Sequence, residues 1–511
     1  MHGFLVLGLL SISAAPLLSG LAAAQLTPEA ARRTASWGAL LSLAAAGVST
    51  GALVWGVHAS VYLPVPHLPW IAFSLRFDGL SAVMTGLVSV LGLTVIGYSG
   101  TYLEGDPRLP RFLSWMSLAL SSVLTLLLAN NLVVIAAAWI ATSVCLHHLL
   151  LHYPERPAAV LAARNKFIVS RIGDICLISA SAILISHYGT SELDQLFAKA
   201  AFGDTGPLPS VCMLLACCAL LKSAQVPFHS WLPDTMETPT PVSAFMHAGI
   251  INAGGFLILR LSPLMAHAPN ALTFVGVVGI ATAAFGSVVM LACPSVKRAL
   301  AFSTMAQMGF MFFECGTGAF GLALLHLVSH SAYKAHAFLT SGSTIGATPR
   351  KAVALPLPAL AKGVIAAAAI MVACLWGLPA VGLTQGPSLR PFDLIFLGAI
   401  AYGLARLWAI RAGTATQAIA VALACVLILS SHFLHAACDR ILGPVPTLAA
   451  PQGLMLIAAL AFGGLFLVQA ILWRSGAWAP GRRIYLYALN GFYVGTYTNR
   501  YVDRIWPRDA A

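Results

Sequence analysis

Fifteen apolar segments, most of them close to the length of a bilayer-spanning helix, constrain this chain more than any other feature. Crossing the hydrocarbon core takes about 20 apolar residues in helical form, and a helix satisfies its own backbone hydrogen bonds where water is absent. We therefore predict an all-α polytopic membrane protein with about 13 to 15 transmembrane helices. The segments are residues 2–24, 36–58, 77–99, 112–129, 131–151, 164–187, 208–226, 241–262, 271–292, 299–316, 318–346, 361–383, 392–410, 415–435 and 452–474.

Composition agrees with a membrane protein and argues against soluble, nucleic-acid-binding and metal-binding proteins. Only 9% of the 511 residues are charged, whereas soluble chains carry about 25%. The net charge of +12 does not indicate nucleic-acid binding, because no Lys/Arg run with interleaved aromatics precedes the C-terminal tail. The ten cysteines form no CxxC pair and no Cys/His cluster, so we predict no metal site, disulfide framework or cofactor in this chain.

The distribution of Lys and Arg predicts the orientation in the lipid bilayer. If the N-terminus lies outside, 19 of these residues, Lys166 among them, fall in inside segments and five, Arg260 among them, in outside segments. This is the positive-inside bias, so we predict an outer N-terminus and a cytoplasmic C-terminus. The first segment lacks the positive n-region of a signal peptide, and we interpret it as a helix. The basic, aromatic tail 475–511 is typical of either a topology-setting segment at the headgroups or a partner-docking segment.

Residues 222–252 interrupt the apolar pattern with charges and prolines. Lys222 lies near the end of one apolar segment and His247 within the next. The prolines between them, which predict broken helices, are Pro227, Pro233, Pro239 and Pro241. A charge at bilayer depth costs about 2.5 to 3.5 kcal/mol, and a broken helix is tolerated there only when it is buried in protein or lines water. The stretch therefore indicates a polar pathway through the membrane.

Two further charges lie in the apolar segment 164–187. Arg171 and Asp174 are three residues apart, a spacing that puts both on one helix face. They form a self-neutralised structural pair, or Asp174 serves as the counter-charge of Lys222. Lys222 itself either extends its amine to the interface or exchanges protons inside the membrane.

A second group of titratable residues follows helical spacing. His326, His330 and Lys334 form a stripe about 12 Å long, which is typical of a proton wire. Zinc binding by the two histidines is the alternative, although no third ligand is close in the sequence. His336 is expected to face another direction. His247 is either a hydrogen-bonded core residue or a further proton relay.

Four motifs give the chain a strong resemblance to the antiporter-like family. They are KSAQVPFHSWLPD, PTPVSAFMHAG, VKRALAFSTMAQMGFMF and HLVSHSAYKAHAFL. The family comprises the large proton-pumping subunits of respiratory complex I, Mrp-type Na⁺/H⁺ antiporters and the membrane subunit of DAB inorganic-carbon accumulation complexes. The resemblance implies two inverted five-helix repeats with broken helices around a hydrophilic axis. The expected ion pathway comprises Lys222, Asp174, Arg171, His247, His326, His330 and Lys334, with Lys297 opening a neighbouring helix.

Two departures distinguish the chain from the complex I pattern. That pattern has a Trp-Glu pair in the fifth span, where this chain has Trp139-Ile140. It also has a lysine in a break of the twelfth span, and residues 361–383 carry no lysine in such a break. We also expect no long lateral helix after the fifteenth segment. These departures, with HAGIINAGGF and the Leu-Asn-Gly-Phe-Tyr of the tail, resemble the membrane subunit of DAB complexes.

The resemblance implies a multi-pass subunit of a bacterial inner membrane that conducts a cation, H⁺ or Na⁺ with H⁺ favoured, and that is not an enzyme by itself. Its implied partner is a large soluble zinc-containing subunit, similar to carbonic anhydrase, which docks on the cytoplasmic side and hydrates CO₂ to bicarbonate. The alternatives are a proton-pumping subunit of an NADH dehydrogenase-type complex, an Mrp-type Na⁺/H⁺ antiporter subunit, and a structural scaffold with an inert axis. The expected divisions are N-terminal helices 1–99, a first repeat 100–262, a second repeat 263–411 that is degenerate at its end, C-terminal helices 412–474 and the tail 475–511.

Overall fold

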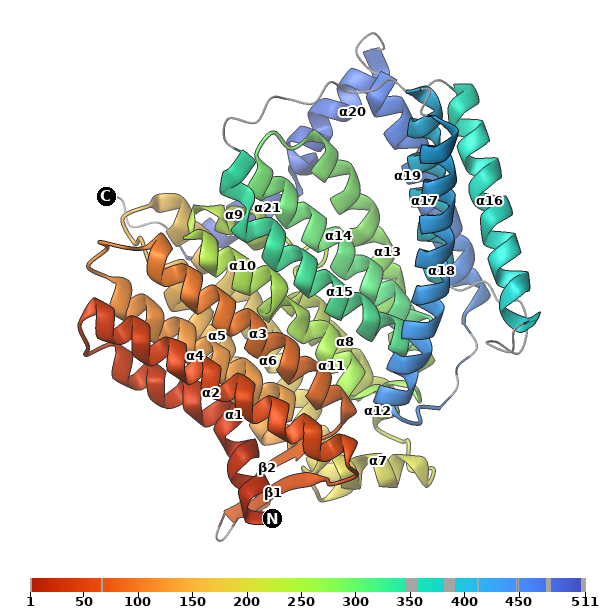
Figure 1. Ribbon diagram of the computed structural model, residues 1–511. Helices are drawn as coiled ribbons and strands as arrows, with labels where there is room; N and C mark the ends of the chain where they lie inside the picture. The colour runs from red at the N-terminus through yellow and green to blue at the C-terminus, as the bar shows by residue number, and fades with distance from the viewer. Residues whose placement is uncertain are drawn as a thin grey trace.

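The protein is a bundle of long helices (Figure 1) in the computed structural model, which describes residues 2–65, 68–344, 357–380, 391–410, 413–446, 448, 450–474 and 479–506. Each of the fifteen predicted segments coincides with a helix or an interrupted helix of these residues. Ten of the described helices are long and apolar enough to cross a membrane. The helix that carries the predicted histidine stripe is not among the ten, because its titratable side chains lower its mean hydropathy. The all-α membrane fold is therefore confirmed.

Six helices form the N-terminal part of the bundle. They are α1 (His2–Ala23), α2 (Pro28–Val54), α3 (Gly79–Tyr102), α4 (Leu109–Leu128), α5 (Leu132–Leu150) and α6 (Pro157–Tyr188). α1 packs against α2 and α4, and α5 packs against α6. α6 begins earlier than the predicted residue 164, because Pro157 lies in its first turn, where proline is well tolerated. This earlier start places Lys166 in the third turn of the helix instead of the first.

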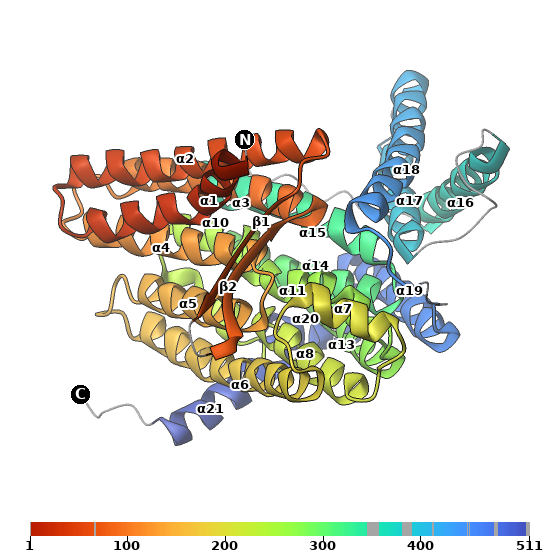
Figure 2. The same cartoon turned by 90° about the horizontal axis from the view of Figure 1, so that it is seen from below.

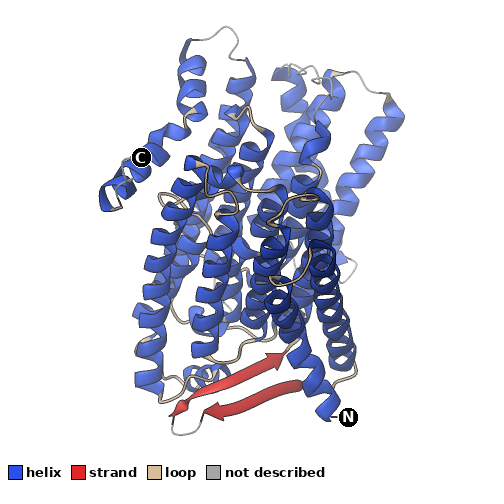
Figure 3. Ribbon diagram, turned by 90° about the vertical axis from the view of Figure 1, so that its left-hand side faces the viewer, coloured by secondary structure: helices blue, strands red, loops and turns tan. Residues whose placement is uncertain are grey.

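Two strands and a short helix cover the end of the bundle at which the N-terminus lies (Figures 1 and 3). β1 (Ala59–Val65) and β2 (Leu68–Phe77) pair antiparallel, with Ala59 opposite Phe77. α7 (Leu193–Ala201) follows α6 at the same end. The sequence analysis predicted none of these three elements, since it searched for segments of spanning length.

The predicted break is present and has two parts. α8 (Leu208–Lys222) ends at Lys222 instead of residue 226, and the chain continues through α9 (Trp231–Asp234) and a 3₁₀ turn (Thr235–Glu237). The next span is itself interrupted: α10 (Thr240–Ala248) is followed by a 3₁₀ turn (Ile250–Asn252), α11 (Ala253–Arg260) and α12 (Ser262–Met265). Pro233 lies in α9 and Pro241 in the first turn of α10, whereas Pro227 and Pro239 lie between helices.

Three helices complete the central bundle. They are α13 (Pro269–Ala292), α14 (Val296–Gly316) and α15 (Phe320–Leu339), followed by a 3₁₀ turn (Ser341–Thr344). α13 and α14 approach closely at two glycines, since a Cβ on Gly309 would lie 2.6 Å from the carbonyl oxygen of Gly279. Small residues at such positions allow helix backbones to pack tightly in a membrane.

The C-terminal helices stand to one side of the central bundle, as Figure 2 shows for α16, α17 and α18. They are α16 (Leu357–Ala380), α17 (Pro391–Ala409), α18 (Thr414–Leu442) and α19 (Gln452–Arg474). α18 contacts α15, and α19 contacts α13. The tail forms α20 (Ala479–Leu489), a 3₁₀ turn (Gly491–Tyr493) and α21 (Val494–Ile505), at the end of the bundle opposite β1 and β2 (Figure 1). The division into repeats at residues 99, 262, 411 and 474 stays a prediction.

Candidate functional site

Lys222 is buried at the C-terminal end of α8, against a tryptophan of α5. Its side chain is only 7% exposed as part of the folded chain. The Nζ atom donates to the carbonyl oxygen of Trp139 at 3.3 Å and lies 4.5 Å from the centroid of the Trp139 ring. A cation over an indole face is stabilised by the ring quadrupole. The amine is therefore held inside the protein instead of reaching the interface.

Asp174 forms the predicted ion pair with Arg171 and also interacts with Lys222. The Arg171 Nη2 atom lies 2.7 Å from Asp174 Oδ2. The Asp174 side chain is buried, whereas that of Arg171 is 35% exposed and its guanidinium lies over the Phe167 ring. Asp174 is also within electrostatic reach of Lys222. The geometry thus contains both of the predicted relationships, the structural pair and the counter-charge.

Lys166 is a member of this cluster that the sequence analysis misassigned. It was counted among the charges of inside segments, but it is 2% exposed on α6. Its amine donates to the Ser143 hydroxyl at 2.8 Å and to the Ser143 carbonyl oxygen, and it interacts electrostatically with Lys222 and Asp174. The prediction was wrong because α6 begins at Pro157. The position of Lys166, about two helical turns before Asp174, was the available signal.

The two interrupted helices meet at a set of side-chain hydrogen bonds. Ser223, just after α8, donates to the carbonyl oxygen of Ile251 at 2.7 Å. Asn252, in the break between α10 and α11, donates to the Ala248 carbonyl oxygen and to Ser331 Oγ of α15, both at 2.7 Å. Backbone groups released by a helix break must find such partners inside a membrane. These bonds hold the break against both α8 and α15.

The predicted stripe on α15 is buried along its length. The exposed fractions of His326, His330 and Lys334 are 6%, 5% and 0%, whereas His336 is exposed, as expected. Lys334 Nζ donates to the carbonyl oxygen of Leu300 at 3.3 Å. The rings of His326 and His330 have centroids 6.4 Å apart. The stripe is therefore a continuous buried row.

His247 lies beside the stripe, at the end of α10. It is 0% exposed and stacks on Phe338 of α15, with ring centroids 4.4 Å apart. It interacts electrostatically with Lys334 and His330. Neither ring nitrogen of His247 or His330 has a hydrogen-bond partner among the described residues. Buried polar nitrogens usually bind a protein group or water, so these rings favour the relay interpretation over a hydrogen-bonded core histidine.

His326 differs from the other histidines, because both of its ring nitrogens face polar atoms of α14. Nδ1 lies 3.0 Å from Glu314 Oε2, and Nε2 lies 2.9 Å from Gln307 Oε1. The sequence analysis missed both partners, although a glutamate in the apolar stretch MFFECG was a signal. Lys297 lies in the first turn of α14, partly exposed and outside this buried set.

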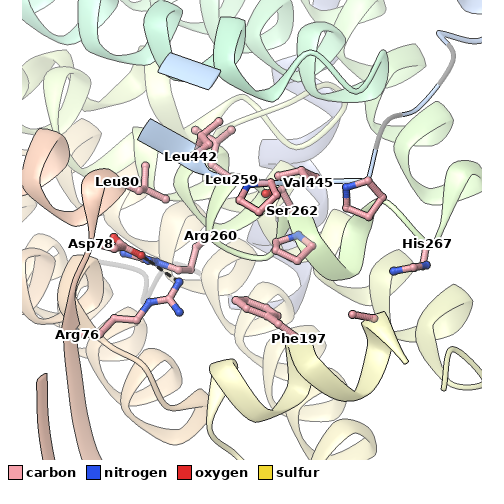
Figure 4. Close-up of a pocket in the computed structure, with 14 residues that line it drawn as sticks. Arg76, Asp78, Leu80, Phe197, Leu259, Arg260, Ser262, His267, Leu442 and Val445 are labelled. Atoms are coloured by element: carbon pink, nitrogen blue, oxygen red, sulfur yellow. Dashed lines mark hydrogen bonds and ion pairs between the residues drawn. The ribbon is translucent and has the colours of Figure 1, made fainter. Parts of the chain in front are cut away.

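A cavity of about 640 Å³ lies at the end of the bundle that carries β2 and α7 (Figure 4). Arg260 of α11 donates to Asp78 Oδ2 at 2.6 Å, and Arg76 of β2 lies 3.0 Å from the same oxygen. Although burial alone would favour the neutral acid, these two guanidiniums hold the pKa of Asp78 well below its ordinary value. The cavity therefore has fixed charges at the C-terminal end of α11. Arg260, which the sequence analysis counted as an outside charge, is buried.

Two family descriptions match the chain. The family described as NADH:quinone oxidoreductase/Mrp antiporter, transmembrane, matches residues 129–419, which is more than half of the chain. The description NADH-ubiquinone oxidoreductase (complex I), chain 5 N-terminus, matches residues 66–113.

Curated relatives match over different lengths. The chain is 35% identical over 507 residues to the probable inorganic carbon transporter subunit DabB2 of Halothiobacillus neapolitanus, covering 94% of this chain and 90% of that protein. It is 38% identical over 334 residues to the probable inorganic carbon transporter subunit DabB of Hydrogenovibrio crunogenus, covering 63% of this chain and 64% of that protein. It is 36% identical over 334 residues to NADH-quinone oxidoreductase subunit L of Mycobacterium tuberculosis, covering 62% of this chain and 53% of that protein.

Solved structures show the same fold. A chain of the Mrp complex from a Dietzia species superposes with a TM-score of 0.60 at 24% identity, covering 99% of this chain and 57% of that chain. A chain of an archaeal membrane-bound sulfane sulfur reductase gives 0.58 at 18% identity, covering 93% of this chain and 77% of that chain. Taken with the sequence matches, these results show that the chain belongs to the NADH:quinone oxidoreductase/Mrp antiporter family of membrane proteins.

Proposed function

We propose that this chain is the proton-conducting membrane subunit of an inorganic carbon uptake complex. The observation that carries the proposal is a set of buried titratable residues on and beside the two interrupted helices. The set consists of Lys222 at the end of α8, His247 on α10, and the stripe His326, His330 and Lys334 on α15. Buried ionisable groups in a membrane interior are costly and mark ion or proton pathways. The relative that matches 94% of this chain is named as a probable inorganic carbon transporter subunit, which supports carbon uptake as the process served.

Proton movement follows from the chemistry of these groups. The two lysines hold and release protons, and the imidazoles of His247 and His330 pass them on through water, since each ring can accept at one nitrogen and donate at the other. Like charges repel strongly in a low-dielectric interior. A proton that arrives at one lysine therefore promotes release from its neighbours, and Asp174 sets how strongly Lys222 retains its charge.

The partner carries the hydration chemistry in this proposal. A soluble zinc subunit similar to carbonic anhydrase converts CO₂ to bicarbonate, and this chain couples that conversion to an ion gradient without being an enzyme itself. The zinc belongs to that partner. Docking takes place at the end that carries α20 and α21, which is cytoplasmic by the Lys/Arg asymmetry. Exposed tyrosines and arginines on these tail helices, Tyr485, Tyr487, Tyr497, Tyr501, Arg482, Arg483, Arg500 and Arg504, offer a basic, aromatic docking surface.

The test is to express the complex in cells that depend on it for inorganic carbon uptake and to introduce Lys222→Ala. We expect carbon accumulation to be abolished while the subunits still co-purify. His336→Ala is the matched control, because this histidine lies on α15 but is exposed. Full carbon accumulation by the Lys222→Ala variant would overturn the proposal.

A second candidate is a subunit of a redox-driven proton pump or an Mrp-type antiporter. It is favoured by the similarity to subunit L of Mycobacterium tuberculosis and by the fold shared with an Mrp complex. Purification separates the candidates: one large zinc protein supports carbon uptake, whereas quinone and iron–sulfur partners support the redox pump. Normal function of a double Lys222→Ala, Lys334→Ala variant would instead favour a structural scaffold with an inert axis.

A further inference from the structure

One buried carboxylate lies beside the pathway but outside the predicted set. Glu314 of α14 is 0% exposed, and its Oε1 atom has no hydrogen-bond partner among the described residues. Within the same part of the chain, its ion-pair partner is His326 of α15. We propose that Glu314 and His326 form a proton-binding dyad at one end of the α15 stripe, with Gln307 as the residue that positions the ring. The inference rests on the proposed proton pathway and adds a binding site to it.

The ring contacts determine how many protons the dyad holds. Nε2 of His326 faces the Gln307 amide oxygen at 2.9 Å, and an amide oxygen only accepts hydrogen bonds, so Nε2 carries a hydrogen. Nδ1 then faces Glu314 Oε2 at 3.0 Å in one of two ways. Either Nδ1 also carries a hydrogen and donates to a carboxylate, or it accepts from a protonated carboxyl group. Both arrangements contain one proton more than a neutral imidazole beside a carboxylate.

The surroundings of the dyad favour this loaded, electrically neutral state. Phe310 lies beside the His326 ring, with centroids 5.6 Å apart, and Phe313 is fully buried next to Glu314 on α14. An uncompensated carboxylate in such surroundings would be unfavourable. Removal of the shared proton leaves a net charge of −1 on the dyad. The dyad therefore releases its proton when a positive charge is available nearby.

His330 provides the neighbouring acceptor. Its ring centroid lies 6.4 Å from that of His326, and both of its nitrogens lack a hydrogen-bond partner among the described residues. In the transfer step, the dyad loses one proton and changes from 0 to −1, while His330 gains it and changes from 0 to +1. No bond other than N–H or O–H forms or breaks. Lys334, four residues further along the stripe, then takes the proton from His330.

Gln307 determines which state is stable. With its oxygen toward Nε2, the imidazole keeps a hydrogen there and the dyad stays loaded. Rotation of the amide by half a turn presents its NH₂ group instead, and Nε2 then accepts a hydrogen bond. The neutral ring can then carry its hydrogen on Nδ1, donating to the Glu314 carboxylate. This is the unloaded state.

A surface pocket lies just beyond the end of the helix that carries Glu314. Glu314 is in the last turn of α14, and the loop that follows and the start of α15 line a surface pocket of about 360 Å³ with Gly318, Phe320 and Gly321. Asp439 of α18 also borders this pocket. A proton can thus reach the dyad from the end of the bundle opposite the tail.

The proposal is tested with the full complex reconstituted in vesicles that contain a pH-sensitive dye. Under an imposed pH gradient, Glu314→Gln is expected to lower the proton flux at least tenfold. His326→Gln should lower it similarly, and the double variant should be no slower than either single one, because the two groups act as one unit. Glu155→Gln, an exposed carboxylate paired with Arg108 at the surface, is the control and should retain the wild-type flux.

A second measurement separates proton binding from a structural role. The infrared carboxyl band of Glu314 should titrate with pH, disappear in Glu314→Gln and change its midpoint in His326→Gln and Gln307→Leu. A flux within twofold of wild type in Glu314→Gln, or a carboxyl band unaffected by His326→Gln, would refute the dyad. If the wild-type complex accumulates carbon but shows no proton flux, the proposed ion is wrong. The infrared titration still decides whether the dyad binds a proton.

Discussion

Lys222 and Lys334, the two buried lysines of the proposed pathway, lie in different electrostatic surroundings. Lys222 has a carboxylate and two further cations within reach, namely Asp174, Arg171 and Lys166, and its amine lies over an indole ring. Lys334 donates to the carbonyl oxygen of Leu300, and no ion pair with a carboxylate is found for it in the part of the chain that the structure describes. The carboxylate on its side, Glu314, lies at the far end of the histidine stripe.

This difference has a consequence for how charge is balanced. At Lys222, a compensating negative charge is near, because Asp174 is within electrostatic reach of the lysine. At Lys334, the compensating negative charge lies on Glu314, which is separated from the lysine by His330 and His326. The first lysine is therefore suited to respond to the Arg171–Asp174 pair, whereas the second is suited to respond to the loading of a distant site.

The largest effect is expected from replacing either lysine by arginine. Arginine keeps the positive charge but does not release its proton, and loss of a proton-transfer group typically costs about 100-fold or more in rate. We expect Lys222→Arg and Lys334→Arg each to lower proton flux about 100-fold in reconstituted vesicles. If Lys222→Arg instead retains flux while Lys334→Arg does not, Lys222 is a static counter-ion of Asp174, and only Lys334 transfers protons.

A smaller effect is expected from Asp174→Asn, which removes the carboxylate beside Lys222 but keeps the shape of the side chain. Flux should fall about tenfold, equivalent to roughly 1.4 kcal/mol. Arg171→Gln, which leaves Asp174 to Lys222 alone, should change flux by less than about threefold, since this arginine is partly exposed. A double variant that restores wild-type flux would show that Arg171 and Asp174 are only a structural pair.

Close helix packing of α11 against α8 and of α14 against α13 supports these contacts. Its contribution can be tested by measuring the thermal stability of glycine variants. A Cβ on Gly254 would clash with Ala219 O and Ser223 Oγ at the end of α8, and a Cβ on Gly309 would clash with the backbone of α13. We expect Gly254→Ala and Gly309→Ala each to destabilise the protein by about 1 to 3 kcal/mol, measured as a lower Tm in detergent. Gly97→Ala is the control, because nothing lies within 4 Å of its added Cβ. An unchanged Tm in Gly254→Ala would show that α8 can move away from the break.

The sequence predicted the spans and the stripe well but missed parts of the site, for physical reasons. Apolar length and helical spacing are local properties, so all fifteen segments and the row from His326 to Lys334 could be read directly. The partner of His326 could not, because Glu314 lies on another helix and meets it only through packing. Lys166 was misassigned because its burial depends on where α6 begins. The hairpin of β1 and β2 lies outside the spans, where hydropathy carries little information.

The smallest effect is expected at the tail, where Asn499 contacts α6 and the segment between α8 and α10. Asn499 of α21 accepts a hydrogen bond from Asn165 at 2.6 Å and donates to Asp234 at 3.3 Å, so it links the tail to α6 and to the break. Asn499→Ala should cost about 1 kcal/mol, which corresponds to roughly fivefold faster hydrogen exchange in α21. Asn490→Ala is the control, because its side-chain amide donates to the Leu486 carbonyl oxygen within α20 and makes no other side-chain hydrogen bond among the described residues. If Asn499→Ala leaves exchange unchanged, the tail is held by its aromatic contacts. If proton flux in Asn499→Ala instead falls more than twofold, the tail contributes to proton transfer at Lys222.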